Sequence, residues 1–327
     1  MLTESASGHP GGSLSIADIM SVLFFREMNI SSENPKDPNR DRFVLSAGHG
    51  SMLEYSLLHL FGYGITIEDI KNFRQVGSLT PGHPEYGHTK GVEITTGPLG
   101  QGICNAVGMA MAEAHLAEKF NKEHFNIVDH YTYAIVGDGC LMEGISGEAS
   151  SLAGTLGLGK LIVLYDSNNI SIEGNTDIAF REDVAKRYEA YGWQVIKVEN
   201  GNDIDSISNA IDDAKRDSLR PSIIIVKNVI GYGCPAKQGK ASAHGEPLGE
   251  ENIRALKENL GWQLEPAFHV PDEVYTNIDK YIGDSVWKEE NWHELFKQYS
   301  EAYPELADEY TKWMRSEEHT SELQSQR

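Results

Sequence analysis

The stretch Tyr131-Thr-Tyr-Ala-Ile-Val136 is followed directly by Gly137-Asp-Gly139, and Lys160-Leu-Ile-Val-Leu-Tyr165 is followed by Asp166-Ser-Asn-Asn169. Both apolar runs are continuous rather than alternating, which is typical of strands buried on both faces of a parallel sheet. A helical pattern at 145–156 lies between the two runs. The segment therefore predicts a β-α-β unit.

The same alternation of helix and strand continues on both sides of this unit. The pattern predicts further strands at 41–46, 194–198 and 222–226, and helices at 15–28, 102–120, 181–191, 204–216 and 252–260. We therefore predict an α/β fold with a mostly parallel sheet covered by helices on both faces. Ligands on such sheets bind beyond the carboxyl ends of the strands.

The chain divides by composition into three parts. Residues 1–270 contain all the predicted strands and form one ligand-binding domain. Residues 271–314 are aromatic, acidic and helical in pattern, so we predict a C-terminal helical connector. Residues 315–327 have no periodicity, resemble a translated sequencing adapter, and are predicted to be a non-native tail. At the other end, the motif Ser7–Gly12 comes so early that we expect a missing N-terminus.

The charge of the chain limits its partners. The 327 residues include 28 Lys and Arg against 49 Asp and Glu, a net charge of -21. Such a surface repels nucleic acid and anionic membranes, so we predict neither as a partner. Cys104, Cys140 and Cys234 have no C-x-x-C spacing, which argues against a disulfide framework or a zinc site. No apolar run reaches the roughly 20 residues of a membrane span, and we expect a soluble, cytoplasmic protein.

Oxygen donors follow two neighbouring predicted strands. Asp138 and Gly139 end the first strand, and Asn168 ends the second. Carboxylate and amide oxygens suit Mg²⁺ or Ca²⁺, and the helix that opens after Gly139 offers free N–H groups to a phosphate. The pattern predicts a metal-bridged diphosphate site, with a capped turn and an Asx turn as the alternative.

Four histidines lie among glycines and prolines: His9, His49, His83 and His244. Any one alone is an ordinary loop histidine, but four together favour recognition of a polyol or phosphate, with proton transfer near neutral pH. Their spacing is unlike that of metal ligands. We assign no role to the other histidines of the predicted fold, namely His59, His88, His115, His124, His130, His269 and His293.

Seven motifs in order resemble transketolase, a thiamine-diphosphate enzyme family. They are Ser7-Gly-His-Pro-Gly-Gly12, Ser46-Ala-Gly-His-Gly-Ser51, Pro81-Gly-His-Pro-Glu85, Thr95-Thr-Gly-Pro-Leu-Gly-Gln-Gly102, Gly137-Asp-Gly-Cys-Leu-Met-Glu-Gly144, Tyr165-Asp-Ser-Asn-Asn-Ile170 and His244-Gly-Glu-Pro-Leu-Gly249. The resemblance covers about residues 3–314 and makes residues 1–270 the diphosphate-binding domain.

The resemblance implies two cofactors, thiamine diphosphate and a divalent metal, Mg²⁺ or Ca²⁺. The implied metal ligands are Asp138, the Asn168 side chain and the Ile170 carbonyl. The implied contacts of thiamine diphosphate, for its diphosphate and its aminopyrimidine, are His49, Gly139, His244, Gly97 and Leu99, together with the metal ligand Asn168.

The resemblance also implies catalytic residues. His9, His83 and His244 would surround the sugar-phosphate substrates, and Glu143 would couple two active sites across a dimer. The alternative for Glu143 is an acid stabilised by the first turn of a helix.

The implied activity is transfer of a two-carbon ketol unit from a ketose phosphate to an aldose phosphate, in the pentose phosphate pathway. The cofactor carries the covalent chemistry. A pyrimidine-binding domain is missing, so we expect a homodimer or a complementary chain as partner and an inactive chain by itself. The missing half is either a separate polypeptide or lost by truncation. Residues 292–314 resemble the connector of the undivided enzyme, and the adapter-like tail and the early start favour truncation.

Two other functions stay open. One is a related thiamine-diphosphate synthase, of the deoxyxylulose-phosphate or dihydroxyacetone type, and the other is a cofactor-binding fragment without catalysis. A nucleotide-binding module is disfavoured, because the sequence has no G-x-G-x-x-G after its first strand and no G-K-[ST] loop.

Overall fold

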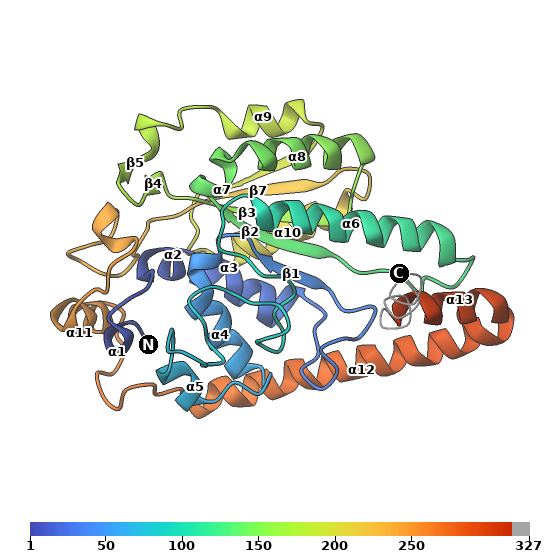
Figure 1. Cartoon of the computed structure of the whole chain (residues 1–327), viewed down its shortest axis with the longest axis horizontal. Helices are drawn as coiled ribbons and strands as arrows, with labels where there is room; N and C mark the ends of the chain where they lie inside the picture. Colours follow the sequence, from blue (N-terminus) through green and yellow to red (C-terminus); the bar gives the residue numbers. More distant parts are fainter. Residues whose placement is uncertain (316–327) are drawn as a thin grey trace, which may run out of the picture.

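The computed structural model describes residues 1–315, so the predicted tail lies outside the described residues apart from Arg315. Its centre is a five-stranded sheet in the order β1-β2-β3-β7-β6 (Figure 1). Every neighbouring pair is parallel, which confirms the predicted fold class. The strands are β1 (Arg42–Leu45), β2 (Thr132–Gly137), β3 (Leu161–Ser167), β6 (Gln194–Val198) and β7 (Ser222–Lys227).

Helices cover both faces of this sheet because successive strand residues point to opposite sides. On β2, Tyr133 and Ile135 belong to one core cluster, and Ala134 and Val136 to the other. All four side chains are fully buried. The helices that contribute to the first cluster include α3 (Ala17–Val22), α4 (Ser51–Leu60) and α10 (Ile204–Arg216), and those that contribute to the second include α6 (Gln101–Phe120), α8 (Gly144–Leu156) and α9 (Val184–Ala190).

One of the predicted helices is divided. Instead of one helix at 15–28, α2 (Pro10–Ser15) precedes α3, which continues into a π-helical turn at Leu23–Glu27. Pro10 suits the first turn of α2, where its missing N–H has no partner in any case. The remaining short elements are α1 (Leu2–Ser5), a 3₁₀ turn at Gly48–Gly50, α5 (Ile67–Lys71), α7 (Asp138–Met142), β4 (Ile170–Ser171), β5 (Gly174–Asn175), 3₁₀ turns at Thr176–Ile178 and Ala241–Ala243, and α11 (Glu250–Asn259).

The predicted connector forms two helices, α12 (Asp272–Ala302) and α13 (Pro304–Met314). The long helix α12 runs along one side of the sheet domain (Figure 1). Ile278 of α12 joins the first core cluster, so the helix is packed along its length rather than projecting into solvent. Further along, Trp292 Nε1 donates to the carbonyl of Ile127 at 2.9 Å, and Tyr299 Oη donates to that of Phe120 at 2.8 Å. Buried aromatic rings that also find a hydrogen-bond partner fix the connector to the end of α6.

None of the helices in the described part of the chain is both long and apolar enough to cross a membrane. The long stretch between α5 and α6 has neither helix nor strand, as predicted. It folds back onto the sheet domain through side-chain bonds, such as that from Tyr55 Oη to the carbonyl of His83 at 3.0 Å. This stretch thereby brings residues 83 and 97–100 to the carboxyl end of the strands.

Candidate active site

A cavity of about 380 Å³ opens at the carboxyl ends of the parallel strands. Its wall includes every site residue suggested by the sequence, although these come from seven separate motifs. They are His9, His49, His83, Gly97, Leu99, Asp138, Gly139, Glu143, Asn168, Ile170 and His244. The fold therefore gathers them at one place, and their individual roles stay predictions.

Asp138 stands at the junction of β2 and α7. One carboxylate oxygen, Oδ1, accepts a hydrogen bond from Tyr165 Oη at 2.7 Å. The other, Oδ2, is buried and accepts none, and burial raises the pKa of this carboxyl above its ordinary value. Because a buried carboxylate oxygen without a partner is unfavourable, this atom is suited to a cation.

Asn168 is oriented by a buried carboxylate. Its Nδ2 donates to Asp166 Oδ2 at 2.9 Å, while its Oδ1 accepts the N–H of Ile170 at 3.0 Å. Asp166 is held in turn by Ser15 Oγ and Asn228 Nδ2, each 2.7 Å from Oδ1. An amide oxygen has two lone pairs, so Oδ1 keeps one for another partner.

These donors fit a hard divalent cation. Asp138, with its carboxylate, and Asn168, with its side-chain amide, both line the cavity, as does Ile170 in the β4–β5 hairpin. Oxygen-only donor sets of this kind favour Mg²⁺ or Ca²⁺ over softer metals.

Glycines let the loop at 97–100 approach α7 closely. A Cβ added to Gly139 would lie 2.8 Å from Leu99 Cδ1. Gly97 has φ 144°, which L side chains rarely adopt, and an added Cβ would lie 3.2 Å from His83 Cγ. Backbone groups at both positions therefore face the cavity without a side chain in the way.

The four predicted histidines form one cluster. Their ring centroids are 5.2 Å apart for His9 and His49, 5.1 Å for His49 and His244, and 6.3 Å for His9 and His83. One of them lies outside a loop, because His49 is in the 3₁₀ turn after β1, whereas His9 is the last loop residue before α2. The ring atoms His9 Nδ1 and His244 Nδ1 are buried and make no hydrogen bond.

The cluster is uncharged at neutral pH. Burial, helped by His244, Arg74 and His83, lowers the pKa of His9 to about 4. Burial, helped by the other histidines, lowers the pKa of His49 to about 3. Burial is also the main cause that lowers the pKa values of His83 and His244. Neutral imidazoles both donate and accept, which suits sugar hydroxyls better than a cluster of cations would.

Glu143 lies at the rim of this cavity. Its extended backbone separates α7 from α8, so the predicted helix after Gly139 is interrupted here. The residue is exposed, and its side chain makes no hydrogen bond or ion pair with the described residues. An exposed carboxylate at the cavity rim is available to a second molecule.

Two residues that support the cation site were missed by the sequence interpretation. Tyr165 and Asp166 are the last residues of a predicted strand and the first of the polar run after it. Asp166 is buried. Its position two residues before Asn168, in the same polar run, was the feature of the sequence that could have identified it. His130, to which we gave no role as a loop residue, is also buried, at the opposite end of β2.

Comparison with known proteins identifies the family. Residues 1–318 match the model described as "Transketolase, thiamine diphosphate binding domain". The chain belongs to the transketolase family. Transketolases of Halalkalibacterium halodurans and Aliivibrio fischeri (transketolase 2) are 56% and 57% identical to it, in each case over 94% of this chain and 46% of the relative.

Solved structures of transketolases have the same fold. A transketolase from Pichia stipitis in complex with sedoheptulose 7-phosphate has a TM-score of 0.94 and 47% identity, covering 96% of this chain and 46% of that one. The enzyme from Leishmania mexicana has a TM-score of 0.93, with 47% identity over 95% of this chain and 46% of that one. The chain thus spans about half the length of the transketolases it matches.

Proposed function

We propose that this chain forms the cofactor-binding half of a transketolase active site, which transfers a two-carbon ketol unit between sugar phosphates. The observation that carries the proposal is the single cavity at the carboxyl ends of β2 and β3. It combines an unpartnered buried carboxylate oxygen on Asp138 with a cluster of neutral histidines. Family membership supports the same activity.

Thiamine diphosphate and Mg²⁺ are the proposed cofactors, with Ca²⁺ as the alternative metal. Asp138, Asn168 and the Ile170 carbonyl would hold the metal, and His49, Gly139 and His244 the diphosphate. Gly97 and Leu99 would line the aminopyrimidine. When bound, thiamine diphosphate supplies the carbanion that such group transfers require. In an acidic protein, the cation and the backbone N–H groups of α7 hold an anion without lysines.

The histidines act on the substrate. His9, His83 and His244 are neutral at pH 7, so each can donate a hydrogen bond to one hydroxyl and accept from another. The same rings can hold or pass a proton at a hydroxyl of the sugar while it reacts. Burial of the rings excludes water from these contacts.

A second domain completes the site. We propose that residues 1–270 are the diphosphate-binding domain, that 271–314 connect it to a pyrimidine-binding domain, and that Glu143 lies at a dimer interface. The partner is a second copy of the whole enzyme or a complementary chain. The pentose phosphate pathway and the cytoplasm are the proposed setting, and three unpaired cysteines support a reducing compartment.

The test combines this chain with the remaining part of a relative. The chain, purified alone and mixed with the pyrimidine-binding part of the H. halodurans transketolase, is assayed for ketol transfer from xylulose 5-phosphate to ribose 5-phosphate. Activity only in the mixture supports the proposal. Substantial turnover by the chain alone contradicts the division of the site.

Substrate profiling of the active mixture separates the related synthases. Pyruvate condensation with glyceraldehyde 3-phosphate, or turnover of dihydroxyacetone in place of a sugar phosphate, would favour a synthase. Binding of thiamine diphosphate without turnover in any mixture would favour a non-catalytic fragment.

A further inference from the structure

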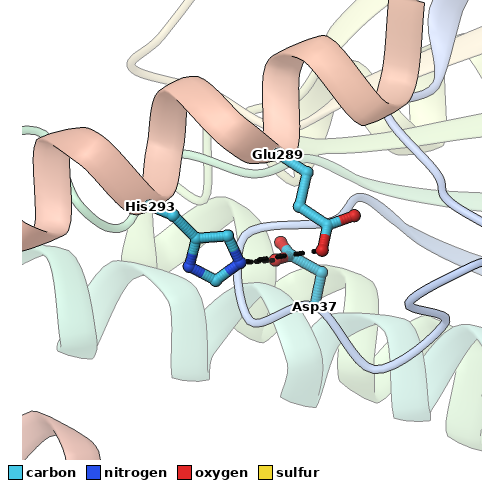
Figure 2. A group of neighbouring side chains, drawn as sticks. All are labelled: Asp37, Glu289 and His293. Carbon is cyan, nitrogen blue, oxygen red and sulfur yellow. Dashed lines mark ion pairs between the residues drawn. The ribbon is translucent and has the colours of Figure 1, made fainter. Parts of the chain in front are cut away.

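Three side chains with metal-ligating atoms meet where α12 crosses the segment before β1 (Figure 2). Asp37 comes from that segment, and Glu289 and His293 lie one turn apart on α12. Their ligating atoms all lie within 4.8 Å of one another. None of the three lines the cavity described above.

Asp37 carries a buried oxygen without a hydrogen bond. The residue is only 4% exposed. Its Oδ1 accepts the N–H of Asn39 at 2.9 Å, but Oδ2 accepts no hydrogen bond and points toward His293. Since a buried carboxylate oxygen needs a partner, this atom indicates a ligand that is bound between loop and helix.

The cluster has an excess of negative charge. Within residues 1–315, the only basic side chain that pairs with either carboxylate is His293. Glu289 is oriented by Asn34, whose Nδ2 donates to Oε1 at 2.9 Å. Outer hydrogen bonds that fix a carboxylate in this way are typical of metal ligands.

The distances fit a shared ion better than direct hydrogen bonds. His293 Nε2 is 3.6 Å from Glu289 Oε1 and 3.9 Å from Asp37 Oδ2, both too long for a hydrogen bond. Ligands about 2.1 Å from a tetrahedral zinc ion lie about 3.4 Å from one another. A small inward movement of the side chains would therefore bring all three to bonding distance.

We propose that Asp37, Glu289 and His293 bind a divalent transition-metal ion, Zn²⁺, that fastens α12 to the segment before β1. One imidazole with two carboxylates suits Zn²⁺, whereas Mg²⁺ and Ca²⁺ prefer oxygen ligands alone. The side chain of His293 is 55% exposed, which leaves a path for the ion and room for water as a fourth ligand. The site is independent of the proposed function.

The test is titration of the full chain with zinc chloride, followed by calorimetry and by hydrogen exchange. Saturating Mg²⁺ and thiamine diphosphate are present, so that the cavity histidines are occupied. We expect one zinc-binding event that protects residues 31–41 and 285–297 from exchange. His293→Gln and Glu289→Gln should each weaken it at least tenfold, because even outer partners of a metal are worth about 10–100-fold. Mg²⁺ or Ca²⁺ alone should give no such protection.

The matched control is His124→Gln, which changes another exposed histidine far from the cluster in sequence. This variant should bind zinc like the wild type. Circular dichroism checks that all variants fold, which is expected for His293→Gln because that side chain is 55% exposed, and which matters most for Glu289→Gln because the Glu289 side chain is only 18% exposed. The proposal is overturned if zinc fails to protect 285–297, or if His293→Gln binds zinc as tightly as the wild type.

Discussion

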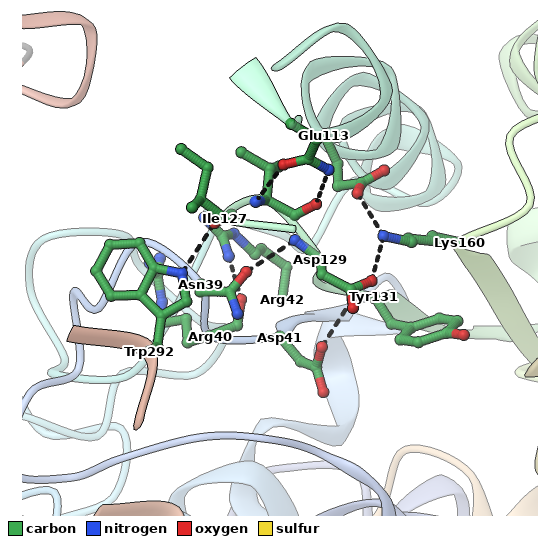
Figure 3. A network of polar contacts seen from close by, with 12 residues as sticks. Asn39, Arg40, Asp41, Arg42, Glu113, Ile127, Asp129, Tyr131, Lys160 and Trp292 are labelled. Carbon is green, nitrogen blue, oxygen red and sulfur yellow. Dashed lines mark hydrogen bonds and ion pairs between the residues drawn. The ribbon is translucent and has the colours of Figure 1, made fainter. Parts of the chain in front are cut away.

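The two ends of the parallel sheet differ in whether their buried polar and charged groups have partners. At the amino end, most of the charged groups have hydrogen-bond or ion-pair partners (Figure 3). Lys160 contacts both Glu113 and Asp129, and Asp41 accepts the N–H groups of Asn29 and Tyr131 at 2.7 Å each. Apart from Asp37 Oδ2, for which a metal ligand is proposed above, the unpartnered buried atoms there belong to neutral groups, such as His130 and Thr132.

At the carboxyl end, groups with ligand-binding capacity are left without partners. Asp138 Oδ2, His9 Nδ1 and His244 Nδ1 are buried and make no hydrogen bond. From this difference we infer that the amino end stabilises the fold. At the carboxyl end, unpartnered buried polar atoms reduce the stability of the fold but can bind a ligand. Substitutions at the two ends should therefore separate stability from binding.

The largest expected effect is on binding, from Asp138→Ala. Affinity for thiamine diphosphate with Mg²⁺ should fall by about 100-fold or more, because a charged metal contact worth about 3 kcal/mol is lost. The free energy of unfolding should change little, because the removal of an unpartnered buried oxygen offsets the loss of the acceptor of Tyr165 Oη. Calorimetry and urea unfolding measure the two quantities.

The control is Asp212→Ala, at an exposed position of α10. This variant should bind the cofactor like the wild type. If Asp138→Ala also bound it like the wild type, the metal site would lie elsewhere.

The reverse pattern is expected for Asp41→Ala at the amino end. Two backbone N–H groups lose their acceptor, which should reduce the free energy of unfolding by about 2–4 kcal/mol. Burial raises the pKa of Asp41 to about 6, so the measurement belongs at pH 8, where the wild-type group is ionised. The folded variant should keep its cofactor affinity, and a loss of affinity would contradict the separation of the two ends.

Two buried histidines extend the comparison to the pH dependence of the free energy of unfolding. Burial lowers the pKa of His49 to about 3 and that of His130, at the amino end, to about 2. Because both values lie below the ordinary 6.5, the unfolded chain takes up protons first as the pH falls. Each histidine should therefore reduce the free energy of unfolding by about 2 kcal/mol between pH 7 and pH 5.

In His49→Gln and in His130→Gln, the decrease in the free energy of unfolding between pH 7 and pH 5 should be about 2 kcal/mol smaller than in the wild type. Urea unfolding at the two pH values measures it. Only His49→Gln should also weaken cofactor binding, because only His49 lines the cavity. Equal losses of affinity in both variants would argue against the assignment of His49.

The smallest effect is expected for Tyr165→Phe. This change removes the hydroxyl that donates to Asp138 Oδ1 and leaves the ring packed in the core. Cofactor affinity should fall about 5–10-fold, corresponding to the roughly 1 kcal/mol of one hydrogen bond. Unchanged affinity in calorimetry would show that the hydroxyl does not position the carboxylate.

Local patterns predicted most of the fold. The apolar runs at 131–136 and 160–165 became β2 and β3, and the amphipathic pattern at 204–216 became α10 with the same bounds. Breaks inside helices were missed, such as the extended Glu143 between α7 and α8. The position of this break depends on how Glu143 packs against the loop at 97–100. A contact between distant segments leaves no signal in the periodicity of apolar residues.

The sequence by itself determined which strands form the parallel sheet and which polar residues follow them, because both are properties of neighbouring residues. Only the tertiary structure decided that Ser15 would hold Asp166, 151 positions away, and that Asp37 would meet Glu289 and His293 on the connector. Contacts between distant segments are set by the packing of layers, and the partner of a buried polar atom is therefore invisible until those layers are in place.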